Sequence, residues 1–202
     1  EKSWATFGTA ATTLLVIARQ GGPGDPAATH PRLLALRVPA DAGGVQVDGQ
    51  PATGLVPELP HARLVLADVS LPAAARLAGD GFSDYGKPFR TLEDLYVGAA
   101  VLAWLLREAR ARDWPAPLRE RLAATLALLA DLSDAPPDAA ATHVVLAGAL
   151  AWARDLHAEV QPLWAATPDE PASQRWQRDA KLLDVAGTAR AARAARAWQS
   201  LG

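Results

Sequence analysis

Glu93 and Asp94 are two adjacent carboxylates, a type of side chain that can transfer protons. A carboxylate that lies beside an acidic hydrogen of a bound molecule can remove it as a general base. The pair also follows Thr91 at the expected start of a helix, where acidic side chains commonly stabilise the positive end of the helix dipole. The sequence therefore offers both a catalytic and a structural interpretation of these two residues.

A stripe of arginines with helical spacing lies near the C-terminus and consists of Arg190, Arg193 and Arg196. Such a stripe could attract phosphate or an acidic partner, although on a helix it is usually a solvated face. The four histidines form no metal-binding pattern, because His143 and His157 are about 21 Å apart along a helix. The sequence contains no G-x-S-x-G, P-loop or G-x-G-x-x-G motif, and we expect no metal site.

The composition of the chain excludes several classes of function. Its 202 residues are 50% hydrophobic and 21% charged, which is typical of a globular protein. A net charge of −2 gives no electrostatic reason to expect a nucleic-acid partner. Cysteine is absent, so disulfides, thiol nucleophiles and cysteine metal sites are excluded.

The same sequence predicts no association with a membrane. Its apolar runs are too short, or too interrupted by charge, to span a bilayer. The residues that follow Glu1 lack the pattern of a signal peptide, so the cytoplasm is the expected location. Because the chain starts at Glu1 and contains no methionine, we expect a fragment or a processed chain.

The first part of the chain, residues 1–72, has the pattern of a β domain. Short apolar runs alternate with turns rich in glycine and proline, and the runs most typical of strands are residues 14–18, 33–38, 45–47 and 62–66. This spacing favours an antiparallel sandwich or barrel. The strands are too few for a complete one, so we predict a partial antiparallel β domain.

The second part, residues 89–202, has the 3.6-residue periodicity of helices. Proline-containing breaks separate four predicted helices, which cover residues 91–111, 117–132, 138–164 and 171–201. Short connections favour antiparallel neighbours and hence a four-helix bundle. The predicted fold class is α+β, mostly α, with a connector over residues 73–88 between the β domain and the bundle.

Residues 178–188, which read RDAKLLDVAGT, are the most specific motif of the chain. They resemble R-D-A-K-I-L-x-I-Y-E-G-T, the closing signature of the acyl-CoA dehydrogenase family. In that family a glutamate before the glycine removes the α-proton of an acyl thioester. Here Ala186 directly precedes Gly187, so the frame of the signature is kept and its catalytic residue is missing.

Further segments resemble the same family in the same order. Residues 1–11 resemble the middle-domain line G-x-K-x-[FWY]-x-[TS]-x-G-x-x-A, and residues 64–72 resemble L-x-F-x-D-V-x-V-P. Residues 77–82 resemble the L-G-x-x-G-x-G-F segment that leads into the bundle. The resemblance covers nearly the whole chain and implies the middle β domain and the C-terminal four-helix bundle, without the N-terminal helical domain.

The resemblance also implies site residues. Arg112 and Trp114 match the loop R-x-[Q]-F-G-x-P-L, which in the family lies at the pyrophosphate of FAD in a neighbouring subunit; Arg112 could equally be a cation at a helix C-terminus. Gly187 and Thr188 match the flavin-contacting end of the closing signature.

Tyr96 stands where the family usually has an arginine, so its hydroxyl is a candidate contact of the substrate. Alternatively, Tyr96 is an aromatic residue of the core or of a subunit interface. Some family members carry the base on the first bundle helix, near Glu93 and Asp94, which are therefore the candidate catalytic residues.

Two functional hypotheses follow from the resemblance. The first is an acyl-CoA dehydrogenase-like flavoprotein that oxidises the α,β-bond of an acyl thioester with FAD, as a part of a larger protein. Its partners would be acyl-CoA or a related thioester, an electron-transfer flavoprotein and further copies of the chain in a homodimer or homotetramer. The second is a catalytically degenerate relative that lacks the family glutamate and acts as a binding or assembly subunit.

Overall fold

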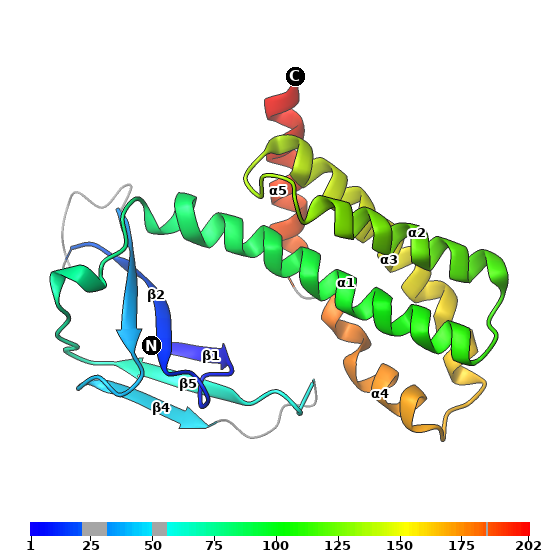
Figure 1. Cartoon of the computed structure of the whole chain (residues 1–202), viewed down its shortest axis with the longest axis horizontal. Coiled ribbons are helices and arrows are strands. Elements are labelled where there is room, and N and C mark those ends of the chain that lie inside the picture. The colour runs from blue at the N-terminus through cyan, green and yellow to red at the C-terminus, as the bar shows by residue number, and fades with distance from the viewer. Residues whose placement is uncertain (22–31, 50–55, 185) are drawn as a thin grey trace. The chain divides into compact units, whose positions relative to one another are not determined.

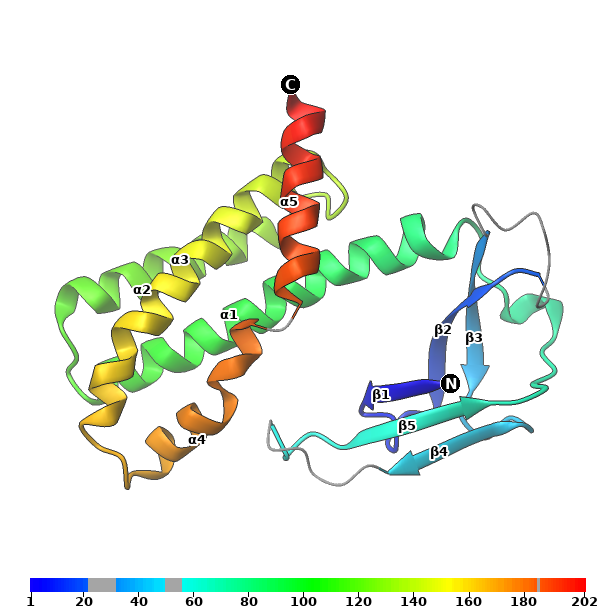
Figure 2. The ribbon, with the colours of Figure 1, turned by 180° about the vertical axis from the view of Figure 1, so that it is seen from behind.

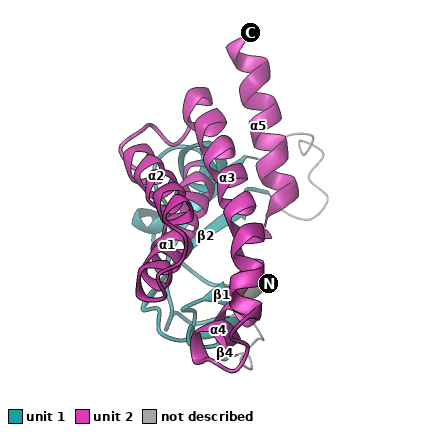
Figure 3. Cartoon of the chain, turned by 90° about the vertical axis from the view of Figure 1, so that its right-hand side faces the viewer, with its two compact units in different colours: residues 1–87 teal, residues 88–202 magenta. Residues whose placement is uncertain are grey.

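A computed structural model describes residues 1–21, 32–49, 56–184 and 186–202 of the chain. These residues form two compact units, Glu1–Lys87 and Pro88–Gly202, which Figure 3 distinguishes by colour. The first unit contains antiparallel strands and the second contains helices (Figure 1). The predicted fold class, mostly helical α+β, is therefore confirmed.

The strands of the first unit form two small antiparallel sheets. The described strands are β1 (Lys2–Thr6), β2 (Thr13–Arg19), β3 (Leu33–Pro39), β4 (Val45–Gly49) and β5 (His61–Leu66). One sheet has the order β1-β5-β4, and the other pairs β2 with β3. The four predicted strands are all present, and β1 is an additional strand that the sequence interpretation treated only as a motif.

The inward faces of these strands form a small apolar core. Leu14 on β2 lies opposite Val38 on β3, and both pack with Ala62 and Leu64 of β5. Gly44 turns the chain into β4 with a φ of +88°, and a side chain there would meet the carbonyl oxygen of Ala67. Only glycine suits this turn, because a side chain would clash with that oxygen as well as being strained at this φ.

The connector that follows β5 is a pair of short helical turns. A 3₁₀ turn, η1 (Ala73–Ala75), precedes a π-helical segment, η2 (Gly81–Gly86). The carboxylate of Asp80 accepts hydrogen bonds from the backbone N–H groups of Ser83 and Phe82 and from the Ser83 hydroxyl. These bonds, above all that from the Ser83 backbone, lower the pKa of Asp80. Asp80 thus caps η2 as an ionised carboxylate.

The second unit contains three long helices followed by a divided fourth segment (Figures 1 and 2). The helices are α1 (Lys87–Ala111), α2 (Ala116–Leu132), α3 (Ala140–Ala165), α4 (Pro171–Asp179), the 3₁₀ turn η3 (Ala180–Asp184) and α5 (Gly187–Leu201). Proline lies at the start of α2 and α4, where it costs no backbone hydrogen bond. The predicted breaks between the helices therefore lie where the structure has them.

The structure differs from the predicted helices at two places. The first helix begins at Lys87, so Thr91, Glu93 and Asp94 lie beyond its first turn and do not stabilise its N-terminus. The predicted fourth helix, residues 171–201, is interrupted after η3, and Ala186 has left-handed backbone angles with φ 64°. A left-handed residue ends a run of helix, because it cannot continue the hydrogen-bond ladder.

Leucine and tryptophan side chains form the core of the helical unit. Leu102 and Leu105 of α1 pack with Leu122 and Leu129 of α2, all fully buried, and with Leu146 of α3. The indole rings of Trp104, Trp164 and Trp176 stack with centroids 5.3 to 6.2 Å apart. In contrast, Trp152 and Trp198 are 56% and 63% exposed. No helix within the described part of the chain is long and apolar enough to cross a membrane.

Candidate functional site

Asp94 is the centre of an ion-pair cluster between α1 and α5. Arg190 Nε donates to Asp94 Oδ1 over 2.8 Å, and Arg193 Nη2 donates to Asp94 Oδ2 over 2.6 Å. Arg190 Nη1 also donates to the carbonyl oxygen of Leu183, over 2.7 Å. The side chains of Asp94, Arg190 and Arg193 are 8%, 12% and 13% exposed, so water screens the cluster weakly.

Helical spacing explains why two arginines reach one carboxylate. Arg190 and Arg193 are three residues apart on α5, which places them on the same face of that helix. The stripe interpreted as a solvated face is therefore largely buried and paired, and only Arg196 of the three is exposed. Each oxygen of Asp94 accepts from one guanidinium and the side chain is 8% exposed, so this candidate base is engaged inside the helical unit rather than displayed toward a substrate.

Glu93 and Tyr96 lie on the outside of α1. Glu93 is exposed, and within the described part of the chain no hydrogen bond or ion pair engages its carboxylate. Tyr96 is 59% exposed, so its ring is not part of the core of the helical unit. The adjacent positions 93 and 94 therefore have opposite environments, one free in solvent and the other bound by two arginines.

Residues 186–188, which match the end of the closing signature of the acyl-CoA dehydrogenases, lead into the N-terminus of α5. Ala186 is the left-handed residue before the helix, and no side chain caps the first turn. Gly187 and Thr188 are exposed, and a side chain at Gly187 would meet no atom within 4 Å. This end of α5 is open, and the residue at the glutamate position is a methyl side chain with no acid–base chemistry.

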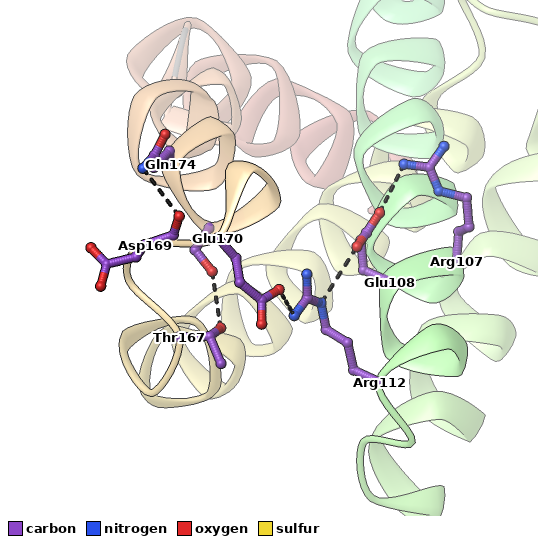
Figure 4. Close-up of polar contacts among 8 residues, drawn as sticks. Arg107, Glu108, Arg112, Thr167, Asp169, Glu170 and Gln174 are labelled. Carbon is purple, nitrogen blue, oxygen red and sulfur yellow. Dashed lines mark hydrogen bonds and ion pairs between the residues drawn. The ribbon is translucent and has the colours of Figure 1, made fainter.

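Arg112 lies at the C-terminal end of α1 in a set of contacts within the helical unit (Figure 4). Its guanidinium pairs with Glu170, and its Nε lies 3.4 Å from Glu108 Oε2. The guanidinium carbon also lies 4.9 Å from the centre of the Trp164 ring, which is a cation–π distance. The arginine predicted to bind the flavin pyrophosphate is thus engaged by two carboxylates and an indole of its own chain.

Trp114 is buried rather than exposed to a ligand. It is 7% exposed, and its ring meets the Trp164 ring edge to face at 4.8 Å. Asp113, with φ 51°, turns the chain so that Trp114 points back into the core. Of the four residues predicted to contact FAD, Gly187 and Thr188 are exposed, whereas Arg112 and Trp114 are held by internal contacts. The described residues therefore fit only part of the flavin site.

A cavity of about 340 Å³ lies between α3 and α5. Four side chains with nitrogen donors line it, namely His143, Arg154, Arg190 and Arg193. Small or apolar residues complete the wall, namely Ala147, Leu150, Gly187, Ala191 and Ala194. This cavity is not predicted by any motif of the sequence. The helical spacing of Arg190 and Arg193 predicts that these two side chains share a face of α5. No local pattern links them to Arg154, because Arg154 lies on a different helix.

His143, at the base of α3, is a structural residue of this region. Its Nε2 lies 2.9 Å from the carbonyl oxygen of Pro137 and 3.3 Å from Thr91 Oγ1. The histidine is 4% exposed and links the start of α3 to α1. No group of three metal-binding side chains occurs in the part of the chain that the structure describes.

Solved structures with the same arrangement of elements are acyl-CoA dehydrogenases and related proteins. A probable acyl-CoA dehydrogenase from Mycobacterium abscessus aligns with 95% of this chain at a TM-score of 0.70 and 16% identity. Butyryl-CoA dehydrogenase from Megasphaera elsdenii aligns with 96% at 0.63 and 17%, and an acyl-CoA dehydrogenase from Geobacillus kaustophilus with 96% at 0.68 and 15%. The predicted resemblance is therefore confirmed at the level of the fold.

The chain spans 58%, 58% and 59% of the length of these three proteins. The sequence matches no protein-family model and no curated protein. The same fold also occurs in dibenzothiophene monooxygenase from Paenibacillus, with a TM-score of 0.60 and 17% identity over 90% of this chain. Because one fold carries different reactions, the fold alone does not decide what this chain does.

Proposed function

We propose that this chain is a catalytically degenerate relative of the acyl-CoA dehydrogenases that acts as a binding or assembly subunit. The proposal rests on the side chains at two positions where a catalytic base could lie. Ala186 occupies the place before Gly187, and Asp94 on α1 has both carboxylate oxygens bound by Arg190 and Arg193. Removal of an α-proton needs a carboxylate that can approach the substrate carbon, and neither position supplies one.

The surface of the helical unit supports a role in assembly. Trp152 on α3 and Trp198 on α5 are more than half exposed, and large aromatic side chains are enriched where protein chains meet. A homodimer or homotetramer packed through the helices is the form that we propose. Acyl-CoA or a related thioester would then be a bound ligand rather than a substrate, and FAD would need residues from outside this chain to complete its site.

A second candidate function is the active flavoprotein, and Glu93 favours it. Its carboxylate is exposed on α1, unlike that of its neighbour Asp94, and is free to approach a ligand from outside the unit. In that case Glu93 would remove the α-proton, FAD held with the help of residues from outside this chain would supply the hydride-accepting chemistry, and an electron-transfer flavoprotein would be the partner. The two candidates differ in whether this chain supplies a working base, and therefore in whether a bound thioester is a substrate.

Reduction of bound flavin by a thioester separates the two candidates. The purified chain is titrated with FAD, then mixed without oxygen with butyryl-CoA, and the visible absorption of the flavin is followed. Where the titration shows that FAD binds, the proposed function predicts that the thioester leaves the flavin spectrum unchanged, and it predicts sedimentation of the chain as a defined oligomer. Bleaching of the flavin that is lost in Glu93→Gln would overturn the proposal in favour of the enzyme. The exposed Glu120→Gln on α2 is the matched control.

A further inference from the structure

The cavity between α3 and α5 is lined by positive charge without a compensating wall of acids. Three arginines, Arg154, Arg190 and Arg193, are among its lining residues, and none of its lining residues is acidic. Asp94 is not a lining residue, and it pairs with two of the three arginines. The local formal balance is therefore three positive charges against one negative charge, or +2.

The guanidinium groups of these arginines have N–H donors left to bind a ligand. Arg190 uses its Nε and Nη1 within the chain, and Arg193 uses Nη2, whereas a guanidinium carries five N–H groups in all. Arg154 is exposed on α3, and no ion pair or hydrogen bond is recorded for it within the described residues. Asp94 holds the other two guanidiniums in place, so the donors are positioned before any ligand arrives.

The other lining residues of the cavity indicate the chemistry of the rest of the ligand. Ala147 and Leu150 of α3 face Ala191 and Ala194 of α5, and these side chains offer only carbon atoms. Gly187 at the open first turn of α5 adds no side chain, and the dipole of that helix strengthens the positive potential of the cavity. A volume of about 340 Å³ is at the lower end of small-molecule sites.

We propose that this cavity binds the phosphate group of a small phosphate monoester. A phosphate monoester carries close to two negative charges at neutral pH, which matches the +2 balance, and its oxygens accept paired guanidinium donors. The short organic part would lie against the alanine and leucine walls. The site belongs to the helical unit alone and does not depend on whether the chain binds FAD or a thioester.

Calorimetric titration of the full chain, without FAD or acyl-CoA, tests the proposal. The probes are inorganic phosphate, propyl phosphate and, as a monoanion of similar length, butyrate, each at low ionic strength. Saturable binding of the two phosphates, tighter than that of butyrate, is expected. Tighter binding of propyl phosphate than of inorganic phosphate identifies a monoester as the ligand type, and equal affinities identify free phosphate.

Two arginine variants decide whether the binding takes place in this cavity. Arg154→Gln removes a guanidinium that has no structural partner, so the fold is kept and phosphate affinity falls by about ten-fold or more. Arg196→Gln, one turn beyond Arg193 on α5 but outside the cavity, leaves the affinity unchanged within about two-fold. The proposal is overturned if neither phosphate binds saturably, or if the two variants weaken binding equally.

Discussion

Replacing Asp94 by asparagine tests the ion-pair cluster that joins α1 to α5. The substitution keeps the size of the side chain but removes its charge, and the new amide group can accept from only one of the two arginines. Arg190 and Arg193, which are 12% and 13% exposed, would then be held in the helical unit without a counter-ion. Breaking a buried pair from one side costs about 3–5 kcal/mol.

The expected loss in Asp94→Asn is somewhat smaller than that range. One hydrogen bond to a guanidinium survives and the arginines keep some contact with water, so we expect unfolding to become easier by about 2–4 kcal/mol. With a urea dependence of about 2 kcal/mol per molar, the midpoint falls by about 1–2 M. The stacked indoles of Trp104, Trp164 and Trp176 report this unfolding by fluorescence, since all three lie in the helical unit.

Asp155→Asn is the control for this measurement. Asp155 is an exposed carboxylate on α3, and its replacement is expected to change stability by less than about 0.5 kcal/mol. If Asp94→Asn were as stable as the control, the pairing of Asp94 with two arginines would not contribute to the fold. The two ion pairs would then give no physical reason to regard Asp94 as unavailable as a base.

Two further predictions concern the segment around α5 and its neighbours. Burial lowers the pKa of His157 below 6.5, although Asp184 opposes the shift, and Gln161 Nε2 lies 2.6 Å from its Nε2. Because the unfolded chain then takes up the proton more readily, the contribution of His157 to stability is present above pH 6.5 and is lost as the pH falls below it. His157→Gln should therefore flatten the decline in melting temperature on acidification from pH 6.5. Separately, Ala186→Gly relieves a left-handed backbone with φ 64° and should raise the free energy of unfolding by about 0.5–1 kcal/mol in urea titrations.

Each of these two predictions has its own control. For His157 the comparison is a substitution of the exposed Gln199 by Glu, which adds an ordinary carboxylate without touching the ring, and an unaltered pH profile in His157→Gln would contradict the assignment. For Ala186 the comparison is Ala195→Gly, in the exposed interior of α5, which should destabilise the chain by about 1 kcal/mol. A loss of stability in Ala186→Gly would contradict the backbone argument.

Much of the fold could be predicted because local chemistry determines it. Proline pairs and proline-rich loops mark the ends of most of the helices, since proline removes a backbone donor and is best tolerated in the first helical turn, although Pro162 lies inside α3. The starts of α2 and α4 at Ala116 and Pro171 accordingly lie within one residue of the predicted positions. Apolar runs between turns predict the other described strands, whereas Lys2–Thr6 of β1 is too short and mixed in character to give a strand pattern.

The candidate site was much less predictable, because long-range pairing determines it. Asp94 and Arg190 are separated by 96 positions in the sequence, and no local pattern distinguishes a paired arginine from a solvated one. The same holds for Arg112, whose contacts with Glu170 and Trp164 come from the far end of α3 and the start of α4. The absence of a glutamate before Gly187, in contrast, is a property of the sequence itself.

Exchange of the α-protons of an acyl-CoA in deuterated water tests the central claim most directly. The exchange needs a base at the α-carbon but no electron acceptor, so it can be followed by proton NMR with the full chain and butyryl-CoA. The account predicts that exchange is no faster than in buffer, with or without added FAD. Exchange that the chain accelerates, and that Glu93→Gln abolishes, would contradict it and show that this chain supplies a catalytic base.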